Sequence, residues 1–203
     1  MKTRELIHEL KHHLPFTVVA TLIAILTFLL IQYLIKIFIS ETLFEIFHPL
    51  HVIASSIVTA GIFYRYRPKV IPALLVGITG SIIIGSLSDI ILPWLGGNLL
   101  SLKTGFHLPI IETPFIILGS ALIGSFIGVA KKATKIPHFI HIFLSVFASL
   151  FYLMAFSLNF NIIYFAEVFV IVLIAVILPC CVSDILFPFF FLGKRIKSCD
   201  CKK

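Results

Sequence analysis

The sequence predicts an all-α polytopic membrane protein of six transmembrane helices, arranged as two inverted three-helix repeats. Three observations predict this class. Of the 203 residues, 60% are hydrophobic and only 12% are charged, which is not the composition of a soluble domain. Apolar runs long enough to cross a bilayer recur between short polar turns. Several short polar phrases also occur twice along the chain, in the same order.

The apolar runs divide the chain into five parts. A polar interfacial segment comes first, then three helices, an extracytoplasmic loop, three more helices and a basic tail. These parts span residues 1–15, 16–93, 94–114, 115–192 and 193–203. The six helices are expected over residues 16–39, 46–64, 70–92, 115–130, 137–158 and 162–192. We expect the third helix to end at Pro93, because proline interrupts a helix.

The basic residues predict the orientation of the helices. With both termini in the cytoplasm, 14 of the 16 Lys and Arg residues fall on the inner side, in the N-terminal segment, two turns and the tail. Only Lys36 and Lys103 fall elsewhere. The positive-inside rule therefore places the protein in the cytoplasmic membrane with both termini inside. It also explains the net charge of +7 without nucleic acid as a partner.

Three phrases carry the repeat. His48-x-x-His51-x3-Ser55 matches His138-x-x-His141-x3-Ser145, at an offset of 90 residues. Ser88-Asp89-Ile90 matches Ser183-Asp184-Ile185 at an offset of 95, and His13-Leu14-Pro15 matches His107-Leu108-Pro109 at an offset of 94. Each half has an odd number of helices, so the second copy enters the membrane upside down. Inverted repeats of this kind build many secondary transporters.

The repeated residues predict two metal sites near opposite faces of the membrane. The outer site would contain His48, His51, Asp89 and His107, and the inner site His13, His138, His141 and Asp184. Three imidazoles and a carboxylate suit zinc, manganese, nickel or iron. Cys180 lies four residues before Asp184 and would add a softer ligand to the inner site.

Glu167 is the remaining acidic residue within a predicted membrane helix, and it is a candidate for proton coupling. Helices 3 and 4 are rich in glycine and serine, which predicts that they pack closely near the centre. Ser55 and Ser145 would orient the histidines one turn before them, or bond back to their own helix.

These patterns predict a transporter of a divalent transition-metal cation, with alternating access between the two halves. The bilayer and the transported ion are the expected partners, and the sequence leaves a homo-oligomer open. An intramembrane metal-dependent hydrolase is the enzymatic alternative; the duplication of the site favours a non-enzymatic transporter. A structural or assembly subunit, with His and Asp locking helices together or capping their ends, is the third interpretation.

Overall fold

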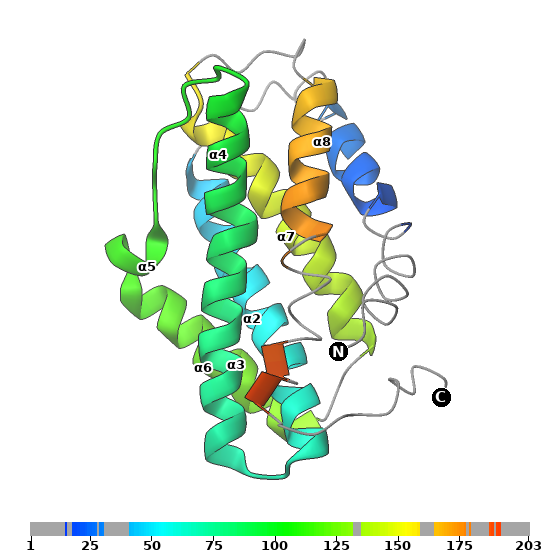
Figure 1. Cartoon of the computed structure of the whole chain (residues 1–203), viewed down its shortest axis with the longest axis vertical. Coiled ribbons are helices and arrows are strands. Elements are labelled where there is room, and N and C mark those ends of the chain that lie inside the picture. The colour runs from blue at the N-terminus through cyan, green and yellow to red at the C-terminus, as the bar shows by residue number, and fades with distance from the viewer. Residues whose placement is uncertain are drawn as a thin grey trace.

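The computed structural model is all-helical wherever it describes the chain, and these residues form no strand. It describes residues 15, 18–27, 29–30, 41–131, 135–158, 165–177, 179, 187–188 and 190–191. The elements are α2 (Glu41–Tyr66), α3 (Val70–Ser86), η1 (Leu87–Ile91), α4 (Leu92–Leu99), α5 (Pro109–Glu112), α6 (Pro114–Lys131), α7 (Lys135–Phe156) and α8 (Phe165–Val176). Figure 1 shows them as one elongated bundle.

Three helical stretches in the described part are long and apolar enough to cross a membrane. They are Glu41–Tyr66, Val70–Leu99 and Pro114–Lys131, with mean hydropathies of 1.6, 2.2 and 1.7. Val18–Thr27, Ile140–Phe156 and Ala166–Val176 are shorter apolar helices within the ranges predicted for helices 1, 5 and 6. The number of spans and the inverted repeat stay predictions. Apart from Pro15, the segments predicted at 1–15 and 193–203 lie outside the described residues.

The third predicted helix does not end at Pro93. It continues without a break from α3 through η1 into α4, which ends at Leu99 (Figure 1). The transition is a π-helical turn in which the Leu92 N–H bonds to the Leu87 carbonyl. Pro93 has no N–H to give to the preceding turn, so the wider turn accommodates it without ending the helix. The prediction of a helix end was therefore wrong by two turns.

Glycines let α2 approach its neighbours closely. A Cβ atom at Gly124 would collide with the Ile53 carbonyl, and one at Gly128 with the Ile57 carbonyl, so α6 packs directly on the α2 backbone. This is the small-xxx-small contact typical of membrane helices. A Cβ at Gly77 of α3 would meet Ser125 of α6 and Ala60 of α2. The predicted contact between the two glycine-rich helices therefore exists, and α2 shares it.

The segment between α4 and α6 folds back along the bundle. Figure 1 shows it descending from the end of α4 to α5, which lies near the middle of the bundle's height. Ser101 and Lys103 adopt left-handed backbone conformations, with φ of 60° and 52°, at the turn that reverses the chain. Thr104 then pairs with Ser157 after the end of α7, through a β-bridge and an Oγ1–Oγ hydrogen bond of 2.8 Å.

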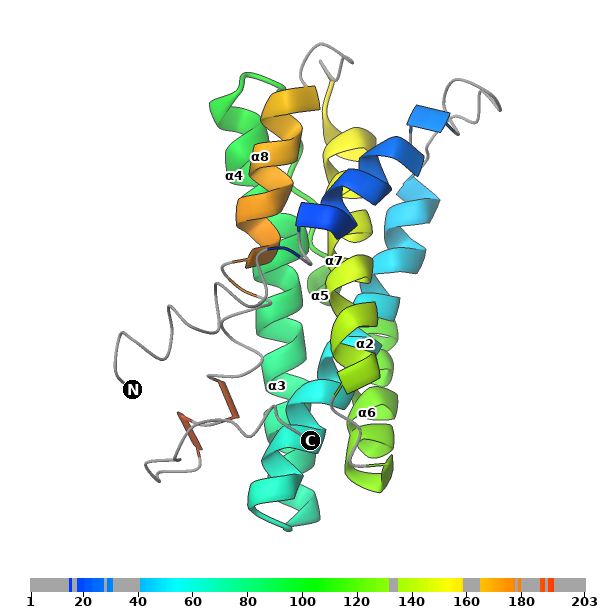
Figure 2. The ribbon, with the colours of Figure 1, turned by 90° about the vertical axis from the view of Figure 1, so that its right-hand side faces the viewer.

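Helices α2 and α7 run antiparallel to one another across the bundle, as the colour gradients in Figures 1 and 2 show. Both helices contribute to the buried core, which is rich in aromatic side chains such as Phe44, Phe147 and Tyr152. The repeated His-and-Ser phrase occurs on α2 and again on α7. The fold therefore places the two copies of this phrase on neighbouring, oppositely directed helices.

Candidate functional site

Two histidines of α2 face the interior of the bundle. His48 and His51 are three residues apart, which places them on one face of the helix about one turn apart. Their side chains are 1% and 0% exposed. Pro49 lies between them in the sequence, and it removes one hydrogen bond within the helix because it has no N–H. The buried face of α2 therefore carries two imidazoles.

Asp89 joins these two histidines. It lies in the π-helical turn η1 and is completely buried. Its Oδ2 atom is 2.8 Å from His48 Nδ1 and 2.6 Å from His51 Nδ1. An ionised carboxylate only accepts hydrogen bonds, so each Nδ1 carries the hydrogen and donates it. Asp89 consequently fixes the tautomer and the orientation of both rings.

The other carboxylate oxygen of Asp89 accepts hydrogen bonds from two hydroxyl groups. Ser88 Oγ donates to Asp89 Oδ1 at 2.7 Å, and Ser145 Oγ donates to the same atom at 2.9 Å. Ser149, one turn further along α7, donates to the Ser88 carbonyl at 3.1 Å. Four donors from three helices thus converge on one buried carboxylate, which is how a charge is stabilised away from water.

His141 of α7 completes the group. Its ring stacks on that of His51 with a centroid distance of 5.7 Å and an interplanar angle of 13°, and its side chain is 0% exposed. We call the set His48, His51, Asp89, Ser88, Ser145 and His141 the central cluster. The sequence assigned His141 to a separate site at the opposite face of the membrane. The structure instead places it beside His51, because α7 crosses α2 at this level.

His107 does not join the central cluster. Its Nδ1 atom lies 2.9 Å from Glu112 Oε2, and its main-chain N–H donates to the Tyr152 hydroxyl at 3.3 Å. The Tyr152 hydroxyl in turn donates to the Gly105 carbonyl at 3.0 Å. The predicted outer set is therefore divided: three of its members meet, and His107 pairs with the acid five residues after it.

Several other predicted site residues are placed differently or not described. Glu167 is exposed on α8 and belongs to no buried group that the described residues form. His13, Cys180 and Asp184 lie outside the described residues, as does the side chain of His138. Within the described part of the chain, no group of three or more His, Cys, Asp and Glu side chains has the arrangement of a metal site.

Two residues outside the predicted metal sites also shape the central cluster. Ser149 repeats Thr59 at the same offset of 90 residues as the histidine phrase, so a longer comparison of the halves would have found it. Gly85 lies against the cluster: a Cβ there would come within 3.3 Å of Val52 Cγ2 and 3.7 Å of His48 Cε1. Its lack of a side chain lets α3 approach the α2 histidines. Its repeat equivalent at an offset of 95 residues is Cys180, the candidate ligand of the predicted inner site.

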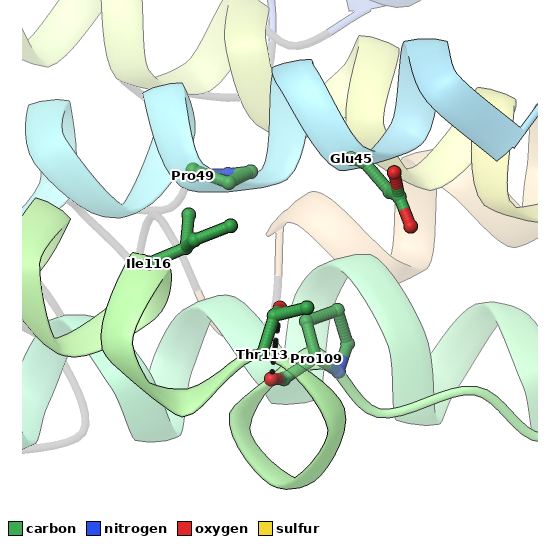
Figure 3. A pocket seen from close by; sticks show the side chains of 5 residues that line it. All are labelled: Glu45, Pro49, Pro109, Thr113 and Ile116. Carbon is green, nitrogen blue, oxygen red and sulfur yellow. Dashed lines mark hydrogen bonds between the residues drawn. The ribbon is translucent and has the colours of Figure 1, made fainter.

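A small pocket opens on the side of the bundle between the first half of α2 and α5. Figure 3 shows its lining residues, which are Glu45, Pro49, Pro109, Thr113 and Ile116. The Thr113 hydroxyl donates to the Pro109 carbonyl at 3.2 Å across the base of α5. The pocket volume of about 40 Å³ suits a few water molecules and is too small for an organic substrate.

Comparisons of the chain with protein-family models, with curated proteins and with solved structures give no match. The class of protein therefore follows from the molecule itself: an all-helical chain with three candidate membrane-spanning helices and a buried His-Asp-Ser cluster.

Proposed function

We propose that the protein is an integral membrane transporter of a divalent transition-metal cation, and that the central cluster is where the cation exchanges with protons. The observation that carries this proposal is the pair of hydrogen bonds from His48 and His51 to Asp89 inside a candidate membrane span. Ionisable groups are expensive within a membrane, and those present there usually lie on an ion or proton pathway.

The chemistry of the cluster supports exchange between a metal ion and protons. The distances of 2.6 and 2.8 Å from the imidazoles to Asp89 are hydrogen-bond lengths. They are shorter than the roughly 3.3 Å that separates two ligands on one tetrahedral ion with bonds near 2.0 Å. Asp89 therefore serves here as the group that orients two imidazoles, as carboxylates do behind zinc-binding histidines. The Nε2 side of each ring is then the side that takes up a proton or the cation.

The relation between α2 and α7 supports alternating access. These helices carry the two copies of the His-x-x-His-x3-Ser phrase, they run antiparallel, and His51 stacks on its repeat equivalent His141. We propose six spans in two inverted repeats that rock against one another around this contact. The second carboxylate of the repeat, Asp184, would act at the other stage of the cycle together with His13, His138 and Cys180.

One observation favours a different function, that of a structural subunit. The hydrogen bonds to Asp89 from His48, His51, Ser88 and Ser145 tie α2, η1 and α7 together. A network of this kind can stabilise one arrangement of helices without binding an ion. The two functions differ in whether the cluster changes its protonation during a cycle.

The experiment that separates them uses the full chain in detergent and in liposomes. Elemental mass spectrometry of the wild type beside Asp89→Asn measures bound metal, and uptake of Zn²⁺, Mn²⁺ or Ni²⁺ into liposomes measures transport. We expect uptake by the wild type and loss of uptake in Asp89→Asn, although this variant still elutes as a single species. A wild type that transports none of these ions, in a folded state that depends on Asp89, would support the structural function.

A further inference from the structure

A second pair of ionisable groups lies outside the central cluster. His107 Nδ1 is 2.9 Å from Glu112 Oε2, and the two side chains are 16% and 49% exposed. The other Glu112 oxygen accepts the Leu108 N–H at 3.3 Å. This imidazole and its half-exposed carboxylate can be reached from outside the bundle, whereas the side chains of the central cluster are buried.

One aromatic ring separates this pair from the central cluster. Phe44, which is 0% exposed, stacks on His48 with a centroid distance of 5.4 Å and an angle of 16°. The same ring meets His107 edge to face at 5.8 Å and 73°. His107 also stacks on Phe156 at 4.6 Å, and Tyr152 packs against Phe44 at 5.2 Å. Phe44 therefore contacts both the accessible imidazole of His107 and the buried imidazole of His48.

Water-sized space lies beside α5, the short turn that carries Glu112. The pocket on the side of the bundle is lined by Glu45, which follows Phe44, and by Thr113, which follows Glu112 (Figure 3). Glu45 adds a negatively charged carboxylate to the lining of this pocket. The pocket therefore lies next to the turn that carries Glu112, whereas the Phe44 ring lies between His107 and the buried His48.

We propose that His107 and Glu112 form an entry site for a hydrated divalent cation, and that the Phe44 ring is the barrier between this site and the central cluster. The distance of 2.9 Å from His107 Nδ1 to Glu112 is a hydrogen-bond length, so Glu112 orients the imidazole and His107 Nε2 supplies the ligand. Water supplies the other ligands because this pair is partly exposed. A barrier of one buried ring keeps the central charges dry until the helices move. The identity of the cargo rests on the proposed function, whereas the barrier rests on the contacts of Phe44 alone.

The entry site is tested by zinc protection of His107 from diethyl pyrocarbonate, which modifies free imidazole nitrogens. The experiment uses the full chain in detergent and reads each histidine by peptide mass spectrometry. We expect Zn²⁺ to protect His107 in the wild type, and Glu112→Gln to raise the zinc concentration needed by about tenfold, as loss of a ligand or its support does. Glu167→Gln, an exposed acid on α8, is the matched control. Equal protection in Glu112→Gln, or none in the wild type, would overturn the entry site.

The barrier is tested with the same reagent and no metal. We expect Phe44→Ala to raise the modification rate of His48 by about tenfold. Loss of the ring should lower the free energy of local opening, and a group that opens more easily is less protected. Phe63→Ala removes an equally buried ring from a different part of the core and should leave His48 protected. Phe44→Leu provides a milder variant if the alanine variant does not fold. No difference from Phe63→Ala would overturn the barrier.

These readouts require no transport. Absence of uptake in liposomes with intact zinc protection would refute the proposed function and leave the site and the barrier standing. Uptake by the wild type with unprotected His107 would leave the proposed function standing and overturn the entry site.

Discussion

The imidazole rings of His51 and His141 lie stacked, with centroids 5.7 Å apart and an interplanar angle of 13°. These residues are equivalent positions of the repeated phrase, at an offset of 90 residues. Their contact joins α2 to α7 next to Asp89, which bonds to His51 on one helix and Ser145 on the other. The central cluster is thus assembled from both halves of the chain.

Asp89 should be the most sensitive position for stability. Asp89→Ala leaves two imidazole N–H groups and two hydroxyl groups without their acceptor in a buried site. Removing one partner from a buried charged network costs about 3–5 kcal/mol. We expect the variant to lose most of its folded population in thermal unfolding followed by circular dichroism. Asp89→Asn, which keeps the shape and one acceptor oxygen, should lose less. Equal stability of all three proteins would contradict the geometry of the cluster.

Ser145 should contribute to the stability of the fold through its hydrogen bond to Asp89, which lies on another helix. Ser145→Ala removes the hydroxyl that donates to Asp89 Oδ1 at 2.9 Å, and hydrogen bonds to charged groups contribute about 1.5–3 kcal/mol. Ser88→Ala removes the other donor to the same oxygen. Because they share one acceptor, the effects in a double-mutant cycle should not add. Additive losses in denaturant unfolding would mean that the two hydroxyls act independently.

The glycines of α6 predict a sharp contrast. Gly124→Ala and Gly128→Ala place a methyl group against the α2 main chain, and overpacking of this kind costs about 1–3 kcal/mol. Gly119 lies on the same helix with nothing within 4 Å of its missing Cβ. Gly119→Ala should therefore be neutral or raise the melting temperature, since alanine favours helix by up to about 1 kcal/mol. Similar melting temperatures for the three variants would argue against the close α2–α6 contact.

The topology can be tested at two turns. A phosphatase reporter, active only outside the cytoplasm, should be active when fused after Leu100 and inactive when fused after Arg67. The basic residues Arg65, Arg67 and Lys69 follow α2, which predicts an inner position under the positive-inside rule. The reversed pattern of activity would overturn the predicted orientation, and with it the placement of both termini in the cytoplasm.

Local sequence signals predicted the helices better than their relative depth. Composition and the lengths of the apolar runs predicted an all-helical chain, and the predicted 115–130 helix is observed as Pro114–Lys131. The sequence grouped His48, His51 and Asp89 near one face of the membrane, and these three residues meet in the structure. The hydrophobic pattern of a single helix, however, says nothing about how far it is shifted along its neighbours.

The position of α7 along α2 determines which further residues join the central cluster. The sequence placed His141 and Ser145 near the inner face, since their helix begins there. In the structure their helix crosses α2 at the level of His51, so they enter the central cluster. The helix end predicted at Pro93 failed because a π-helical turn absorbed the proline. His107 does not join the central cluster because its loop folds back and places Glu112 beside the His107 ring.

The most direct test of the central claim is proton movement during metal uptake. Liposomes that contain the full chain and an internal pH-sensitive dye are given Zn²⁺, Mn²⁺ or Ni²⁺ outside, and internal pH is recorded. The account predicts a metal-dependent pH change with the wild type that is lost in both His51→Gln and Asp89→Asn, with the folded fraction checked by size-exclusion chromatography. A wild type that takes up metal with no pH change, or an undiminished change in both variants, would contradict it.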